Sequence, residues 1–411
     1  MLYTLATSSP RKLARPMKFS AGALLLIFQA LSCLAQMPSA PQVFTLDQAI
    51  AYAQANYPAV RAALSQAAAA RAVIGVARTA YLPQANSLYQ MNRATANNIA
   101  GPLLPQGVIP AISGPVQAST SNESFWGSAA GVLASWEPID FGYRGAVVNV
   151  ARAGETTANA QAEVIRLDVA LGVTNAYLGL LAARQVTQAA QTNVERRQVL
   201  ANSVGVLVQN QLRPGADASR AEADLARARI GLIQAQTAEN ASRVVLANLL
   251  GLNAAGVDIV PGPLLALPAT ASLPEQEAAG NPYAVAQMSR IAEAMAREQV
   301  LAKSYFPKFF LQSVISGRGS GAGTGISSGG SAGLDLQRMN WAAGVQVTFP
   351  ILQIFSIHAA RRVEQANETT ERARYDQSLL QISGQMALAQ NRLEGARQVV
   401  QNTPAGGVGS L

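Results

Sequence analysis

The chain has almost none of the residues that build catalytic or metal sites. Its 411 residues include one cysteine, Cys33, and one histidine, His358. Disulfides need paired cysteines, and metal centres need clusters of Cys, His, Asp or Glu. His358 lies among apolar residues, which favours a structural role over a catalytic or metal-binding one. The sequence therefore predicts no enzyme activity, no metal and no cofactor.

Two weaker motifs also have simple structural explanations. Glu137 and Asp140 could form a carboxylate pair, but we expect them at a strand–helix corner, where capping accounts for them. The glycine-rich stretch 317–333 lacks the lysine and the flanking βα unit of a phosphate-binding loop. We expect it to be a flexible loop.

Half of the excess of positive charge lies in the N-terminal region. The formal net charge is +8, from 31 basic and 23 acidic residues, but four of the basic residues precede position 19. The rest of the chain then has 27 basic residues (31 − 4) against 23 acidic ones. No basic cluster with interleaved aromatics follows, so nucleic-acid binding is disfavoured. No later apolar run reaches 18 residues without a charge, so we expect no membrane-spanning helix.

Residues 1–35 have the features of a signal peptide. Basic residues precede an apolar run at 21–31 that is too short to span a bilayer. Cys33 and Ala35 supply small residues at the −3 and −1 positions, which predicts cleavage after Ala35. Lipidation of Cys33 is the less favoured alternative, because Ala30-Leu31-Ser32 is a poor lipobox.

The remainder contains an internal duplication with an offset of 224 residues (305 − 81). "YLP" at 81–83 and "YFP" at 305–307 each follow a proline-free helical stretch that begins after Pro58 or Pro282. Proline fits the first turn of a helix and disfavours helix in the residue before it. Each pair of prolines therefore frames one helix of about six to seven turns.

A strand, a polar loop and a returning strand follow each of these helices. The strands alternate apolar and polar residues over about ten positions, the length of a tilted transmembrane strand. Trp126 and Trp136 end one strand, and Trp341 and Phe349 end another. We interpret these four aromatics as a membrane-interface girdle. Ordinary core aromatics of a soluble hairpin are the alternative for any single strand.

Each returning strand leads into a very long helix. Apolar residues between 164 and 183 follow two separate seams with spacings of three and four, which suits a helix with neighbours on both sides. The first long helix ends at the turn 211–217, which contains Pro214 and Gly215, and Asp217 or Ser219 is a candidate N-cap for the next helix. Thr45 is a plausible N-cap at the first helix of the chain.

These patterns define the expected organisation. The signal peptide (1–35) precedes a first repeat (36–255) with helices 45–56, 59–82, 142–210 and 217–250 and strands 84–93 and 125–136; a linker (256–274) leads to a second repeat (275–411) with helices 283–304 and 355–401 and strands 308–317 and 341–349.

In this order, the elements resemble the TolC family of outer-membrane channel-tunnel proteins. The most specific segments are "FTLDQAIAYAQANYPAV" at 44–60, the YLP and YFP pair, "WEPIDFG" at 136–142 and "ASRAEADLARARIGLIQAQ" at 218–236. The resemblance implies a mainly α fold with a membrane β-barrel contribution. Three protomers would form an α-helical barrel and give four strands each to one shared β-barrel. Four strands cannot close a barrel alone, and open edges are not tolerated in lipid.

The resemblance also implies location and partners. The protein would lie in the outer membrane of a Gram-negative bacterium, contact its lipid and extend into the periplasm. It would be the passive duct of a tripartite efflux or type I secretion system, with a periplasmic adaptor and an inner-membrane transporter. The adaptor would dock at the tip turns, which contain the residues Gln211, Leu212, Arg213, Pro214, Gly215 and Asp217 in the first repeat and Gly407 and Gly409 in the second.

The second repeat departs from the family pattern. After Pro350 only 61 residues follow (411 − 350), and the expected final return helix is missing, so we interpret the sequence as truncated. Two other functions remain open from the sequence. A periplasmic adaptor would have one helical hairpin with small β domains, and a structural coiled coil of the envelope would lack the paired strands.

Overall fold

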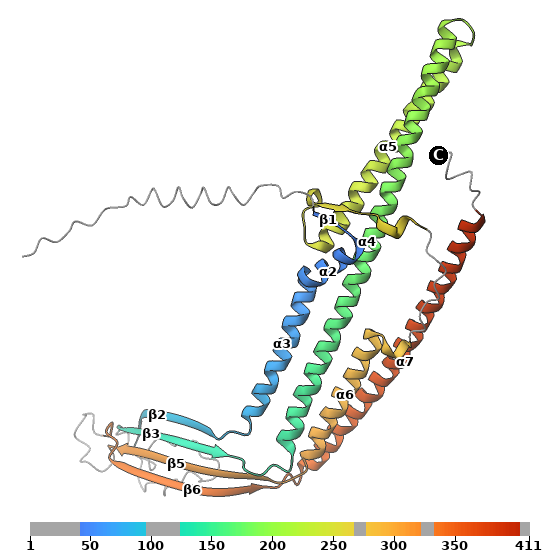
Figure 1. Ribbon diagram of the computed structural model, residues 1–411. Helices are drawn as coiled ribbons and strands as arrows, with labels where there is room; N and C mark the ends of the chain where they lie inside the picture. The colour runs from blue at the N-terminus through green and yellow to red at the C-terminus, as the bar shows by residue number, and fades with distance from the viewer. Residues whose placement is uncertain (1–41, 96–123, 267–276, 322–332, 403–411) are drawn as a thin grey trace, which may run out of the picture.

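The computed structural model describes residues 42–95, 124–266, 277–321 and 333–402. The predicted signal peptide, Cys33, Gly407 and Gly409 lie outside these residues. Long helices run side by side, and four long strands extend away from one end of them (Figure 1). The helical hairpin formed by α4 and α5 reaches furthest from the sheet (Figure 1).

The elements follow the order expected from the sequence, with small differences at their ends. The helices are α2 (Leu46–Asn56), α3 (Pro58–Thr79), α4 (Tyr143–Gln209), α5 (Gly215–Leu250), α6 (Pro282–Lys303) and α7 (Gln353–Asn402). The strands are β1 (Gln42–Phe44), β2 (Gln84–Thr95), β3 (Ser124–Trp136), β4 (Val257–Ile259), β5 (Lys308–Ser320) and β6 (Arg338–Thr348). Short 3₁₀ turns cover Ala254–Gly256, Gly262–Leu265 and Ala278–Gly280.

The duplication is visible in the first helix of each repeat. Helices α3 and α6 both contain 22 residues, and Pro58 and Pro282 occupy their first turns. Each helix ends shortly before the proline of its YLP or YFP motif, and β2 or β5 begins directly after that proline. Thr45 caps α2 through a capping box with Gln48, as the sequence predicts.

The four long strands form one antiparallel sheet in the order β2-β3-β5-β6. Strands β3 and β5, from different repeats, are central and pair from Gly127–Ser320 to Trp136–Leu311. Strand β5 extends to Ser320, three residues beyond the end predicted at 317. Backbone pairing does not need side chains, so the ladder continues through Gly317 and Gly319.

A second, two-stranded sheet was not expected. Strand β1 pairs in parallel with β4, which belongs to the stretch predicted as the linker between the two repeats. Tyr177 of α4 is fully buried there, and its hydroxyl contacts the carbonyl oxygens of Phe44 (3.1 Å) and Val260. The main hydrophobic core surrounds this point and unites α2, α4, α5 and the small sheet. The first residues of the predicted linker therefore belong to the hydrophobic core.

Helix α4 has 67 residues, about 100 Å at 1.5 Å per residue. Its apolar side chains fall into buried and exposed groups: Val173 and Leu180 are fully buried, whereas Leu171 and Leu178 are exposed. Within this chain, one of the two predicted seams is thus only partly covered. Among the described residues, no helix pairs with the C-terminal half of α7 as α5 pairs with α4.

Two helices, α3 and α4, are long and apolar enough to cross a bilayer by length and composition alone. This finding qualifies the expectation that no helix could span a membrane. Both are alanine-rich, and α3 packs against part of the much longer α4. Alanine raises mean hydropathy and also allows close helix packing, so their composition fits paired helices.

Candidate functional site

The four-stranded sheet has two chemically different faces. The pairing register places Val132 opposite Ile315 and Ile315 opposite Trp341, all on one face. Ile315 is 62% exposed and Trp341 is 80% exposed. The apolar face also includes Tyr89, Met91, Ala130, Ala134, Trp136, Phe309, Leu311, Met339, Ala343, Val345 and Val347. Among the described residues of one chain, nothing packs on this band of large apolar side chains along most of its length.

The opposite face carries most of the polar side chains. Gln312 lies opposite Ser135 on one side and Gly344 on the other, and Arg318 lies opposite Arg338. Its polar members are Gln84, Asn86, Gln90, Ser135, Lys308, Gln312, Ser316, Arg318, Arg338, Asn340, Gln346 and Thr348. Alternation of this kind is typical of a strand between lipid and water.

Within the described part of the single chain, both edges of this sheet are open. Strand β2 pairs only with β3, and β6 pairs only with β5. Each edge therefore presents a row of backbone donors and acceptors that another chain can pair with. A sheet with an apolar face and two free edges is incomplete as a monomer.

The four predicted interface aromatics lie at or near the ends of strands. Trp136 donates from its indole Nε1 to the carbonyl oxygen of Tyr81 (3.1 Å), at the helix end of the sheet. Trp126, at the far end, is contacted by the guanidinium of Arg93 at 5.7 Å from its ring centroid. Trp341 is highly exposed, and Phe349 lies one residue beyond β6 rather than within it. Their role as a girdle remains a proposal.

The first strand–helix corner is organised by a buried arginine that the sequence analysis did not single out. Arg144 contacts Asp140 (Nε to Oδ2, 3.1 Å) and donates to the carbonyl oxygens of Ala80 (3.1 Å) and Glu137. Asp140 also accepts from the backbone N–H groups of Gly142 and Arg144, so it caps α4 as predicted. Capping does not account for Glu137, whose Oε1 atom is buried without a described hydrogen-bond partner. The sequence feature that could have identified Arg144 was its position two residues after the WEPIDFG motif.

Burial alone would raise the pKa of Asp140, but these contacts outweigh burial. Hydrogen bonds from the backbone and side chain of Arg144 and from Gly142 stabilise the carboxylate and lower its pKa. The corner is therefore held by a charged pair at neutral pH.

The second corner uses different residues. Tyr305 of the YFP motif packs edge-on against His358, with ring centroids 5.4 Å apart. Glu298 of α6 accepts from Arg361 and Gln365 of α7, both at 2.9 Å. The hydrogen bond from Arg361 is the main cause of a lowered pKa at Glu298. His358 thus contacts an aromatic ring, and the described residues contain no group of three or more His, Cys, Asp or Glu that could hold a metal.

The two corners also meet each other. Phe141, which follows Asp140 with a left-handed φ of 50°, stacks on Phe306 at 5.2 Å between ring centroids. It also contacts Phe309 at 6.0 Å. The WEPIDFG motif of the first repeat and the YFP motif of the second are therefore packed together in space.

The turn 211–217 forms the tip between α4 and α5. Gln211 is left-handed (φ 59°), and the amides of Leu212 and Gln211 donate to the carbonyl oxygens of Leu207 (2.8 Å) and Val208 (2.9 Å). These bonds are those of a Schellman cap, in which glycine is usual at the left-handed position.

The prediction that Asp217 or Ser219 caps α5 is wrong. The helix begins at Gly215, two residues before Asp217, and no side chain caps it. Asp217 instead lies in the first turn, near Arg213 at 3.6 Å. An acidic residue at this position is favourable next to the helix N-terminus. Whether the tip residues dock an adaptor remains a proposal.

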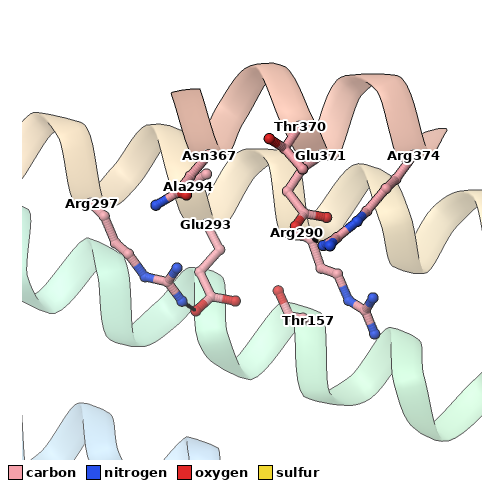
Figure 2. Close-up of a pocket in the computed structure, with 9 residues that line it drawn as sticks. All are labelled: Thr157, Arg290, Glu293, Ala294, Arg297, Asn367, Thr370, Glu371 and Arg374. Carbon is pink, nitrogen blue, oxygen red and sulfur yellow. Dashed lines mark hydrogen bonds and ion pairs between the residues drawn. The ribbon is translucent and has the colours of Figure 1, made fainter. Parts of the chain in front are cut away.

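A charged surface pocket of about 440 Å³ lies where α4, α6 and α7 meet (Figure 2). Glu293 pairs with Arg297, and Glu371 pairs with Arg374 at 2.5 Å. Arg290 points toward α4 and donates to Gln161 (3.0 Å). Nearby, a hydrogen bond from Tyr283 to Asp168 raises the pKa of the tyrosine to about 12. The contacts of Arg290 with Gln161 and of Tyr283 with Asp168 join α6 of the second repeat to α4.

Comparisons with known proteins agree with this architecture. A family model described as outer membrane efflux protein matches residues 49–252. The fusaric acid resistance protein FusA of Burkholderia cepacia is 27% identical over 315 residues, which cover 75% of this chain and 55% of that protein. The chain thus spans about half the length of this curated relative.

Solved structures of outer-membrane channels have the same fold. The OprN channel matches with a TM-score of 0.65 at 20% identity, over 87% of this chain and 76% of that one. VceC of Vibrio cholerae matches with a TM-score of 0.62 at 17% identity, over 87% and 82% of the two chains. The open state of MtrE from Neisseria gonorrhoeae matches with a TM-score of 0.63 at 20% identity, over 87% and 75%.

Proposed function

Because the chain belongs to the outer membrane efflux protein family, we propose that it is the outer-membrane duct of a tripartite export system. It lies in the outer membrane and extends into the periplasm. Three copies share one barrel, to which each contributes its four strands, and their long helices form a tunnel. The duct is passive and catalyses no reaction.

The observation that carries this proposal is the sheet with two chemically different faces and two open edges. In lipid, an exposed sheet edge leaves backbone N–H and C=O groups without hydrogen bonds. Each such group costs on the order of several kcal/mol. Pairing of β6 with β2 of the next copy removes both edges at once. The apolar face then contacts lipid, and the polar face lines a water-filled lumen.

The helices support the same assembly. Leu171 and Leu178 form an exposed apolar seam on α4, on a different side from the buried Val173 and Leu180. A neighbouring copy would cover such a seam, as in a coiled coil. The aromatic side chains of Trp136 and Phe349 then lie near the periplasmic interface, and those of Trp126 and Trp341 lie further out.

The partners follow from the position of the tip. The turn 211–217 is the part of the described chain furthest from the sheet (Figure 1), so it faces the inner membrane. We place the docking site of a periplasmic adaptor there, with an inner-membrane transporter behind it. Leu212 is 71% exposed and is the apolar residue best placed for the contact.

The name of the relative FusA concerns resistance to fusaric acid. This favours export of small molecules by the present chain over secretion of proteins. Selectivity among such molecules then belongs mainly to the transporter.

Disulfide cross-linking between copies tests the shared barrel. Ser87→Cys on β2 is combined in turn with Ala343→Cys, Val345→Cys or Val347→Cys on β6, all on the apolar face. We expect at least one pair to give dimers and trimers on non-reducing gels of outer membranes. The single-cysteine variants are the controls and should give no trimers. A chain that fractionates with soluble periplasmic proteins, or no cross-link in any register, would contradict the proposal.

The tip assignment needs its own test. Leu212→Asp should abolish co-purification with the adaptor while the trimer still forms. Leu200→Asp, at an exposed leucine on α4 away from the turn, is the matched control. Equal loss in both variants would point to the helix surface rather than to the tip.

A further inference from the structure

All charged residues in the four long strands are basic. Strands β2, β3, β5 and β6 contain Arg93, Lys308, Arg318 and Arg338 and no aspartate or glutamate. Three of these four, all except Arg93, lie on the polar face of the sheet. This imbalance is unusual, because natural surfaces normally mix both signs.

Two of the arginines are direct neighbours across strands. Arg318 of β5 and Arg338 of β6 are register partners in the antiparallel ladder. Like charges directly opposite each other destabilise a sheet, so the pair has a cost that neutral residues would avoid. Arg318 lies ten residues from Lys308 along β5, which corresponds to about 33 Å at 3.3 Å per residue. Lys308 lies at the helix end, with its Nζ 5.1 Å from the ring centroid of Tyr143.

The nearest acidic residue in the described part of the second hairpin is Asp335, and its backbone lies on the other face. A Cβ at Gly319 would come within 1.9 Å of the Asp335 carbonyl oxygen. Position 319 shares its face with Ser128 and Gly317, which belong to the apolar side. The turn 333–336 therefore crosses the apolar face, away from the face of the two arginines.

We propose that Arg318 and Arg338 form a cationic ring inside the outer end of the barrel and make the duct favour anionic solutes. The inference rests on the proposed function, because a lumen exists only in the assembled trimer. Three copies then place six guanidinium groups around one opening. Rings of Arg or Lys select anions in pores, and walls of low dielectric strengthen their field. The preferred cargo is a small molecule with a carboxylate, phosphate or sulfate group.

Ion selectivity in planar bilayers tests the ring directly. The purified trimer is inserted and the chloride-to-potassium permeability ratio is obtained from the reversal potential in a KCl gradient. We expect a ratio above unity for the native protein. In the Arg318→Glu/Arg338→Glu variant we expect it to fall below unity, and in Arg318→Gln/Arg338→Gln to lie between these two.

Arg93→Gln is the matched control. It removes one positive charge from the same sheet, but on the apolar face, so the permeability ratio should stay at the native value. The effect of the ring should also weaken as salt rises, because the screening length shortens from about 10 Å at 0.1 M to about 3 Å at 1 M. If the double variants fail to assemble, Arg338→Gln alone should lower the ratio by a smaller amount.

The outcomes separate this inference from the proposed function. Conducting trimers with a native ratio at or below unity, or with the same ratio in the native and double-Glu proteins, would overturn the cationic ring and leave the duct intact. Absence of trimers and of any conductance in the native protein would overturn the duct itself.

Discussion

The guanidinium group of Arg144 lies over the ring of Tyr81, with its central carbon 5.0 Å from the ring centroid. The same arginine donates to the Ala80 carbonyl oxygen, so one buried side chain joins the end of α3 to the start of α4. Strands β2 and β3 leave the helices at this point. One buried charged residue therefore ties the two helix ends together where the strands begin.

Arg144→Met should destabilise the protein strongly. The substitution leaves Asp140 and two carbonyl oxygens without their partner, and breaking a buried ion pair costs about 3–5 kcal/mol. The midpoint for heat dissociation of the trimer on unboiled gels, or for loss of helical circular dichroism, measures the effect. Arg152→Met on the same helix is the control, since Arg152 is exposed and contacts only Asn149 among its described hydrogen bonds. Equal stability of the two variants would show that the corner does not depend on Arg144.

The contribution of Asp140 should disappear in acid. Its pKa in the folded protein is below the ordinary value of 3.8, so ionised Asp140 stabilises the fold fully above about pH 5. This stabilisation is lost as the pH falls through the folded-state pKa. The melting temperature of the native protein should therefore exceed that of Asp140→Asn at pH 7, and the difference should shrink below pH 4. A difference that is constant between pH 7 and pH 3 would contradict the assigned ion pair.

Gln211→Gly should stabilise the tip. Gln211 is left-handed, and this conformation costs a non-glycine residue about 1 kcal/mol relative to glycine. Hydrogen exchange of the α4–α5 hairpin, measured by mass spectrometry, should become slower by a few-fold. Gln209→Gly, at the last residue of α4, is the control and should speed exchange, because glycine destabilises a right-handed helix. Faster exchange in Gln211→Gly would mean that the cap is different in solution.

Tyr177→Phe should loosen the small sheet. The hydroxyl contacts the carbonyl oxygens of Phe44 and Val260. The Phe44 oxygen keeps the Val260 amide as a donor (3.1 Å), but the Val260 oxygen loses its described partner, at a cost of about 1–3 kcal/mol. Limited proteolysis should then cleave near β1 or β4 sooner than in the native protein. Tyr375→Phe on α7, whose hydroxyl has no described hydrogen bond, should be cleaved at the native rate. If both variants resist protease equally, the contact of Tyr177 does not hold the sheet.

Much of the architecture followed from local patterns in the sequence. Pro58 and Pro282 marked the starts of two 22-residue helices, and Pro83 and Pro307 marked the starts of two strands. Alternation of apolar and polar residues predicted that the strands have two different faces. These features depend on neighbours within a few residues, where proline geometry and side-chain period act directly.

Other features depended on residues far apart in the chain. No local pattern showed that β3 pairs with β5, that the three-residue strands β1 and β4 meet, or that Phe141 stacks on Phe306. The same holds for Arg144 at the corner and for Arg318 opposite Arg338. A shift of one residue in register would move every side chain of a strand to the other face. The sequence by itself thus determined which segments are helices and strands and which strand faces are polar, whereas only the tertiary structure decided which of these faces, charges and rings meet.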